Sequence, residues 1–150
     1  MRTLRPWIGF RVAAALVAVT DTTATADWDP ARFATEDTLE LLTVSAETGE
    51  HWFPVWLVVL DGQIYVRLGS RAAGRVENNT RAPILSVRIA GEEFSAVRGE
   101  PVPEMADRVA QAMAEKYTTD LFVRYMSHPL TLRLVPVVRE ARDRCLAGSA

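Results

Sequence analysis

The chain has 150 residues, 49% of them hydrophobic, and a formal net charge of −2 at pH 7. This length fits a single domain with a sizeable core. The nearly neutral charge argues against a protein that holds nucleic acid by bulk electrostatic attraction.

The first 26 residues have the three parts of a secretory signal peptide. Two arginines lie within residues 1–5, a mostly apolar stretch covers 7–19, and small residues end at Ala26. The apolar stretch is shorter than the roughly 20 residues of a membrane-spanning helix, so we expect no membrane anchor after cleavage. The prediction is a secreted or periplasmic protein. Because Arg11 interrupts the stretch, the alternative is an amphipathic helix of a cytoplasmic protein that keeps its N-terminus.

Residues 27–138 are predicted to form the folded domain, and residues 139–150 a C-terminal tail. At the start of the domain, Asp29-Pro30 is typical of a short helix with proline at its first position. Trp28 and Phe33 flank this piece and are expected to pack it against the rest of the domain.

Alternation of apolar and polar residues predicts a series of strands. Asp61-Gly62 is a strong hairpin signal, because glycine adopts positive φ without steric cost. The strand over 52–60 is apolar on both faces, so one face should fill the core and the other should be covered by a helix or a second subunit. The predicted strands cover residues 39–46, 52–60, 63–68, 84–89, 94–99 and 130–138.

Helices are predicted between these strands. A short polar helix covers 71–79, and a longer one covers 104–117, where apolar residues recur at helical spacing. A further short helical piece is predicted over 119–126. Six strands with a helix between the last two predict a mainly β (α+β) fold, a small closed antiparallel barrel with attached helices. The alternative is an open α+β sheet with helices on one face.

The sequence lacks the common signatures of hydrolytic and metal-dependent enzymes. It has no paired-histidine motif, CxxC, Gly-x-Ser-x-Gly or Walker-type loop. His51 and His128 are expected to be surface or capping residues. Cys145 is the sole cysteine, so no internal disulfide is expected. We therefore predict no metal site and assign no catalytic residue.

Arginine and hydroxyl side chains gather where the strand over 63–68 gives way to the short helix. Arg67 lies on the polar face of the strand, Ser70 follows, and Arg71 and Arg75 are four residues apart on one helix face. Such a junction offers backbone N–H groups, a hydroxyl and guanidinium groups to a phosphate. The alternative is that each arginine pairs with a nearby glutamate or is solvated.

The order of these elements resembles the flavin-binding split-barrel superfamily, which includes pyridoxamine-phosphate-oxidase-like and deazaflavin-dependent nitroreductase-like proteins. The resemblance covers residues 39–137. It is carried by an apolar-Pro-Val-Trp strand, Asp-Gly, an Ile-Tyr strand, Ser-Arg, a basic helix and Asn-x-x-Ala-Pro. It implies a six-stranded antiparallel split β-barrel with flanking helices.

The resemblance also implies a phosphate site for an FMN or deazaflavin cofactor. Ser70 and Arg71 match the Ser-Arg pair of the family, and Arg67, Arg71 and Arg75 would neutralise the phosphate. The family often has a lysine directly after that pair, where this chain has Ala72. Arg75, one turn later, is the expected substitute for this lysine.

The resemblance further implies a homodimer that binds the cofactor in the groove between subunits and acts as an oxidoreductase on a small-molecule substrate. Trp56 is a candidate to stack on the cofactor ring, the alternative being a core or interface role. The alternative function is a non-enzymatic dimeric barrel that binds haem or another small ligand.

Overall fold

The computed structural model of the chain describes residues 27–117 and 127–137. The predicted signal peptide (1–26), the helical piece over 119–126 and the predicted tail, which includes Cys145, lie outside these ranges. Within the described ranges, no helix is long and apolar enough to cross a membrane.

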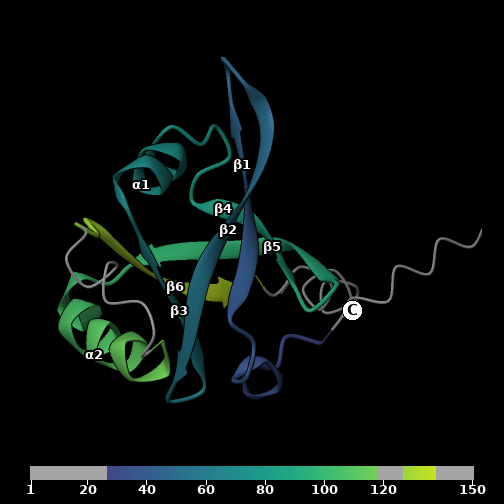
Figure 1. The fold of residues 1–150 in the computed structure, drawn as a ribbon. Coiled ribbons are helices and arrows are strands. Elements are labelled where there is room, and N and C mark those ends of the chain that lie inside the picture. Colours follow the sequence, from purple (N-terminus) through teal and green to yellow (C-terminus); the bar gives the residue numbers. More distant parts are fainter. Residues whose placement is uncertain (1–26, 118–126, 138–150) are drawn as a thin grey trace, which may run out of the picture.

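The strands form a closed antiparallel barrel in the order β1-β2-β3-β6-β5-β4 (Figure 1). This confirms the predicted fold class, and the open-sheet alternative is wrong. β1 pairs with β4 and β3 pairs with β6, and these two ladders close the sheet on itself. The strands are β1 (Thr38–Ser45), β2 (Gly49–Leu60), β3 (Gln63–Leu68), β4 (Ile84–Ile89), β5 (Glu92–Pro101) and β6 (Leu130–Pro136).

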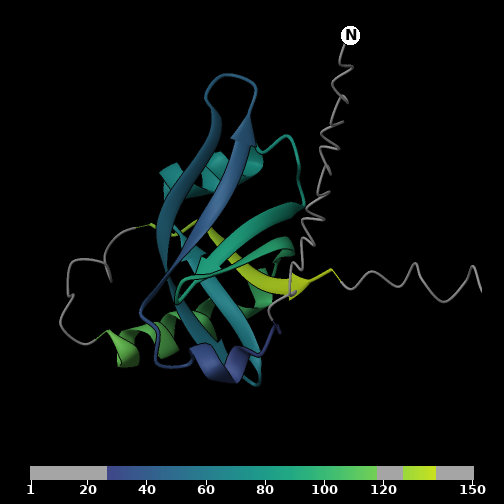
Figure 2. The same ribbon diagram turned by 90° about the vertical axis from the view of Figure 1, so that its right-hand side faces the viewer.

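β2 begins three residues earlier than the alternation predicted, at Gly49, whose φ is +66°. A tight turn makes this extension possible, because the Ser45 and Thr48 hydroxyls lie 2.7 Å apart and the Thr48 N–H donates to Ser45 Oγ. The β1–β2 hairpin therefore extends beyond the body of the barrel in both views (Figures 1 and 2).

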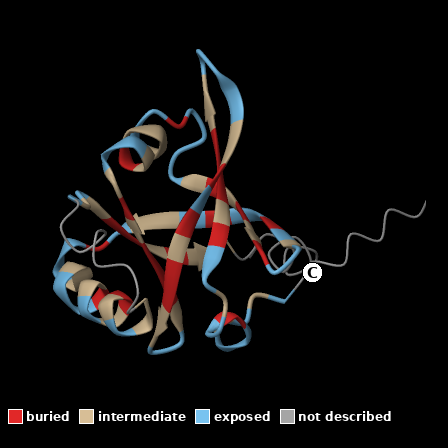
Figure 3. Ribbon diagram, in the orientation of Figure 1, coloured by how far each residue is buried: buried red, intermediate tan, exposed pale blue. Residues whose placement is uncertain are grey.

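Alternate residues of each strand fill the barrel, as Figure 3 shows by the red segments along its strands. Leu41, Val66 and Val87 are fully buried there. The 3₁₀ helix η1 (Pro30–Phe33) begins as predicted, with Asp29 accepting from the Ala31 N–H. The rings of Trp28 and Phe33 both pack edge-on against Phe94, which confirms that they hold this piece to the barrel.

The outer face of β2 is covered in part by a helix. α2 (Ala106–Lys116) follows the 3₁₀ helix η2 (Pro103–Met105) and buries Val109 and Met113 against Val58 and Tyr65. The outer face of β2 is predicted to be covered by a helix or by a second subunit, and α2 covers the part of it near Leu60. Trp52 and Trp56, farther back along β2, remain partly exposed.

α1 (Ser70–Glu77) forms the predicted arginine-rich helix. The buried Asn79 fixes its C-terminal end to the barrel. Its amide oxygen accepts from the Val44 N–H at 3.1 Å and from the Arg81 N–H at 3.2 Å, and its amide nitrogen donates to the Ile84 carbonyl at 2.9 Å. α1 and α2 consequently lie at opposite ends of β3, with α1 beside the protruding hairpin (Figures 1 and 2).

Candidate functional site

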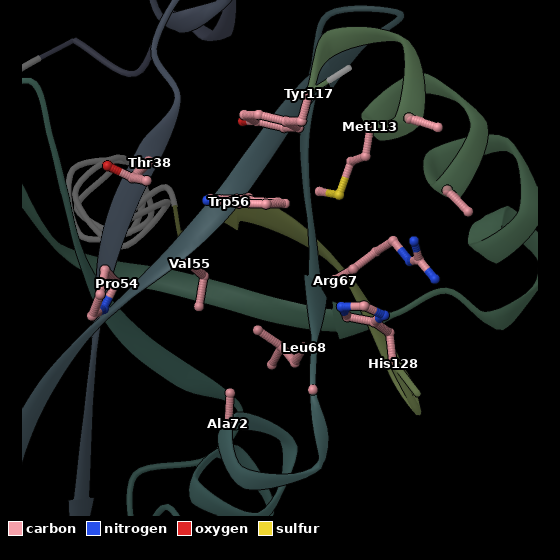
Figure 4. A pocket seen from close by; sticks show the side chains of 13 residues that line it. Thr38, Pro54, Val55, Trp56, Arg67, Leu68, Ala72, Met113, Tyr117 and His128 are labelled. Atoms are coloured by element: carbon pink, nitrogen blue, oxygen red, sulfur yellow. The ribbon is translucent and has the colours of Figure 1, made fainter. Parts of the chain in front are cut away.

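A cavity of about 380 Å³ lies between the start of α1, α2 and strands β2 and β3. We call it the Trp56 pocket. Its walls are largely apolar and include Val55, Leu68, Ala72 and Met113. Figure 4 shows Trp56 and Tyr117 on one side of the pocket and Arg67 and His128 on the other.

The aromatic side of the pocket is a stacked pair. The rings of Trp56 and Tyr117 have centroids 4.6 Å apart and planes 16° apart. The Tyr117 hydroxyl lies 2.5 Å from the Asp37 carbonyl oxygen and 2.7 Å from that of Leu57, both acceptors. Burial raises the pKa of Tyr117 to about 12. The phenol is thus neutral at physiological pH, and its ring is fixed by backbone acceptors.

Lys116, next in the chain to Tyr117, is not among the described residues that line the pocket. Its Nζ donates to the carbonyl oxygens of Glu36 and Leu57, the latter at 3.1 Å. Burial is the main influence on this lysine and lowers its pKa. The C-terminal end of α2 is in this way tied to the segment before β1 and to β2.

Arg67 is the only formally charged residue among the described residues that line the Trp56 pocket. It is partly buried, and burial lowers the pKa of its guanidinium. Within the described ranges it has no carboxylate within 4 Å. The pocket therefore combines apolar walls with one cation that no carboxylate of the described ranges neutralises.

A second, more polar hollow of about 560 Å³ lies between α1 and the β1–β2 hairpin. We call it the polar groove. Ser70, Arg71 and Arg75 line it from α1, and Glu47 is the one carboxylate among its described lining residues. Its other side chains with a hydroxyl or amide are Thr43, Ser45, Thr48, Asn78 and Thr80. This composition suits an anion with several acceptor oxygens.

A third hollow, of about 530 Å³, adjoins both. It shares Gly69, Ala72 and Pro54 with the Trp56 pocket, and Ser70, Arg71 and Arg75 with the polar groove. Phe53 forms part of its wall, and the Arg75 guanidinium lies 5.9 Å from the centre of that ring. We call these three adjoining hollows, which are lined in turn by the β1–β2 hairpin, the start of α1 and α2, the trough.

The structure divides the five predicted site residues into two groups. Ser70, Arg71 and Arg75 line the polar groove, as their spacing on the helix suggested, whereas Arg67 and Trp56 line the neighbouring pocket. Side chains alternate across a strand and advance around a helix. Residues close in sequence at the β3–α1 junction therefore face different hollows.

Sequence reasoning missed three residues that shape the site. Tyr117 is the last residue of the helix predicted over 104–117, and His128 is predicted to be a surface or capping residue. Both line the Trp56 pocket. Asn79 appears in the sequence only as the asparagine of the Asn-x-x-Ala-Pro motif, which does not indicate that its side chain positions α1. His128-Pro129, just before β6, was the available hint that His128 lies near the β3 edge of the barrel.

In comparisons with known proteins, no family model matches the chain and no curated protein matches its sequence. Solved structures match. HutZ, the haem storage protein from Vibrio cholerae, has 20% identity and a TM-score of 0.51, over 72% of this chain and 87% of its own. A domain-swapped dimer has 13% identity and a TM-score of 0.49, over 67% and 80%.

An F420-H2-dependent reductase has 16% identity and a TM-score of 0.39, covering 66% of this chain and 94% of its own. At sequence identities this low, similarity to a solved structure is evidence for the fold and not for the function. The closed six-stranded antiparallel barrel and the likeness to HutZ establish the split-barrel fold that the sequence predicts.

Proposed function

We propose that this protein is an oxidoreductase that binds FMN or a deazaflavin in the trough and acts on a small-molecule substrate. The observation that supports this proposal is that the polar groove, lined by arginines and hydroxyls, adjoins a hollow walled by Phe53 and then the apolar Trp56 pocket. The anionic tail of a flavin-type cofactor would lie in the groove and its flat ring along Phe53, which leaves the Trp56 pocket for a substrate. The cofactor would supply the hydride chemistry, and the protein its binding and orientation.

The polar groove would hold the cofactor phosphate. Arg71 and Arg75 have no carboxylate within 4 Å in the described ranges, so their charges are available to an anion. The Ser70 hydroxyl lines the same groove, at the first turn of α1. The ring would extend past Phe53 toward the mouth of the Trp56 pocket.

A homodimer is part of this proposal. Trp52, Pro54 and Trp56 lie on the outer face of β2, where α2 does not bury them fully. An apolar face of this kind favours a protein partner. Size-exclusion chromatography with light scattering should give twice the mass of the mature chain, and a monomer at micromolar concentration would contradict it.

A second candidate function is haem binding without enzymatic activity. His128 lines the Trp56 pocket opposite the aromatic pair, and imidazole is a common axial ligand of haem iron. The fold is also that of the haem storage protein HutZ.

Absorbance of the purified protein, followed by titration with FMN, a deazaflavin and hemin, tests both functions. The proposed function requires saturable binding of one of the two flavin-type cofactors. A Soret band that depends on His128, together with no binding of either flavin, would favour the haem function instead. Failure of all three ligands to bind would contradict both functions.

We also propose export with cleavage after Ala26. Mass analysis of the protein from its native host should find Asp27 as the first residue. Intact Met1 on cytoplasmic material would contradict the proposal.

A further inference from the structure

We propose that the Trp56 pocket binds small carboxylic acids with a flat apolar body, and that Arg67 holds the carboxylate. The inference deepens the proposed function, because it names the class of substrate that would lie beside the cofactor. The role of the acid as a substrate rests on the proposed function, but its binding to the pocket can be tested without any cofactor.

The first argument is the charge balance of the pocket. Its described lining includes one guanidinium and no carboxylate. Two neighbouring polar groups are directed at a backbone acceptor, since Tyr117 Oη and Lys116 Nζ both contact the Leu57 carbonyl oxygen. Neither group neutralises Arg67 or competes with it for a bound anion. Among the described lining residues, His128 is the one other titratable side chain on the Arg67 side.

The second argument is that Arg67 differs from the arginines of the barrel wall. Apart from Arg67, Arg71 and Arg75, every arginine in the described ranges has a carboxylate within 4 Å. A partly buried cation loses hydration, and a carboxylate restores the lost interactions through two parallel N–H···O bonds. One guanidinium matches a single negative charge, whereas the polar groove, with two arginines, better suits a phosphate.

The third argument is the shape and chemistry of the remaining walls. The indole of Trp56 presents a flat surface stacked on Tyr117, and Leu68, Ala110 and Met113 supply apolar contacts. A flat hydrocarbon body is held by such surfaces, and a thioether adds a favourable contact with aromatic rings. At about 380 Å³ the pocket is near the lower end of ligand-site volumes, so the acid should be small.

The test compares 1-naphthoate with the neutral 1-naphthamide by calorimetry on the full chain. The two probes have the same ring system and differ in charge. We expect the unmutated protein to bind naphthoate about ten to a hundred times more tightly, the usual range for a charge-assisted contact. Arg67→Met should remove this preference. Arg98→Met is the matched control, because Arg98 is an exposed strand arginine outside the pocket, and it should leave the preference unchanged.

A second variant tests the location. Ala110 lines the pocket from α2, so Ala110→Phe should weaken the binding of both probes together. Equal affinities for the two probes in the unmutated protein would overturn the inference, as would a preference that survives Arg67→Met. If Arg67→Met does not fold, Arg67→Gln serves the same comparison.

Adding FMN separates this inference from the proposed function. Simultaneous binding of FMN and naphthoate supports both. Displacement of naphthoate by FMN would assign Arg67 to the cofactor and overturn the acid site alone. Arg67-dependent naphthoate binding in a protein that binds no flavin would leave the acid site standing and contradict the proposed function.

Discussion

The arginines of the barrel wall form ion pairs with carboxylates, whereas those of the trough form none within the described ranges. On the wall, Arg88 of β4 donates to Glu40 at 3.0 Å and to Glu93 at 3.1 Å, and it lies 4.2 Å above the Trp52 ring. Hydrogen bonds to these two carboxylates raise the pKa of its guanidinium. Arg133 of β6 likewise donates to Glu100 of β5 at 2.7 Å.

In the trough, Arg67, Arg71 and Arg75 have no such carboxylate in the described ranges. The difference shows which cations serve to join neighbouring strands and which are available to a ligand. A wall arginine forms ion pairs with carboxylates of neighbouring strands, which neutralise its charge. Within the described ranges a trough arginine has no carboxylate within 4 Å, so the anion that we propose as ligand would supply the missing partner.

Arg71 and Arg75 lie on α1, whose C-terminal end is tied to β1 and β4 by Asn79. Asn79→Ala removes three hydrogen bonds and leaves buried backbone groups without partners, so it should lower the free energy of unfolding by about 3 kcal/mol. Urea denaturation measures this. The exposed neighbour supplies the control, and Asn78→Ala should cost far less. Equal losses would mean that Asn79 does not anchor α1.

Removing a trough arginine should weaken ligand binding and leave the fold intact. Arg71→Ala should reduce FMN affinity about ten- to a hundredfold, because a charge-assisted phosphate contact contributes about 1.5–3 kcal/mol. The loss should be smaller for riboflavin, which has no phosphate. Equal losses for the two flavins would place Arg71 away from the phosphate, and Arg98→Ala is the control that should change neither affinity.

Removing a wall arginine should lower the stability of the fold and leave ligand binding unchanged. Arg88→Met breaks the bridge between β1, β4 and β5 and should lower Tm by a few degrees, with no change in naphthoate or FMN binding. Arg67→Met should keep Tm at or slightly above the value of the unmutated protein, because it replaces a partly buried cation, which has no carboxylate within 4 Å in the described ranges, with an apolar side chain. Thermal unfolding of both variants decides this, and a larger drop for Arg67→Met would remove the distinction between the two regions.

The smallest effect concerns the phenol that fixes the pocket wall. Tyr117→Phe loses the hydroxyl contacts to Asp37 and Leu57 and should cost about 1 kcal/mol at pH 7. Because the pKa of Tyr117 is raised from 10.0 to about 12 in the folded protein, the unfolded chain loses this proton first as the pH rises. The stability that Tyr117 contributes is therefore complete below pH 10 and lost between pH 10 and 12.

Unfolding measured across that range should show the Tyr117→Phe variant losing less stability than the unmutated protein. Lys116, whose pKa is lowered, acts in the opposite direction just below its ordinary value, and it is present in both proteins, so the difference between them isolates the phenol. Parallel pH profiles would show that Tyr117 is not the titrating group.

Local pattern determined the elements of this protein. Alternation placed the strands, Asp61-Gly62 the hairpin between β2 and β3, and Asp29-Pro30 the start of η1, because each signal depends on the geometry of a few consecutive residues. The same alternation showed that β2 is apolar on both faces. It could not show that α2 covers only the end of that face near Leu60, since the helix comes from a segment more than forty residues later.

The site shows the same limit. The sequence identified the arginines and Ser70 as a group, and helix spacing correctly put Arg71 and Arg75 on one face. Only the closed barrel decided that Arg67 faces a different hollow, together with Trp56, Tyr117 and His128. These residues come from strand β3, strand β2, the end of α2 and the segment before β6. Their proximity follows from strand pairing and helix packing across the whole chain, which no local pattern encodes.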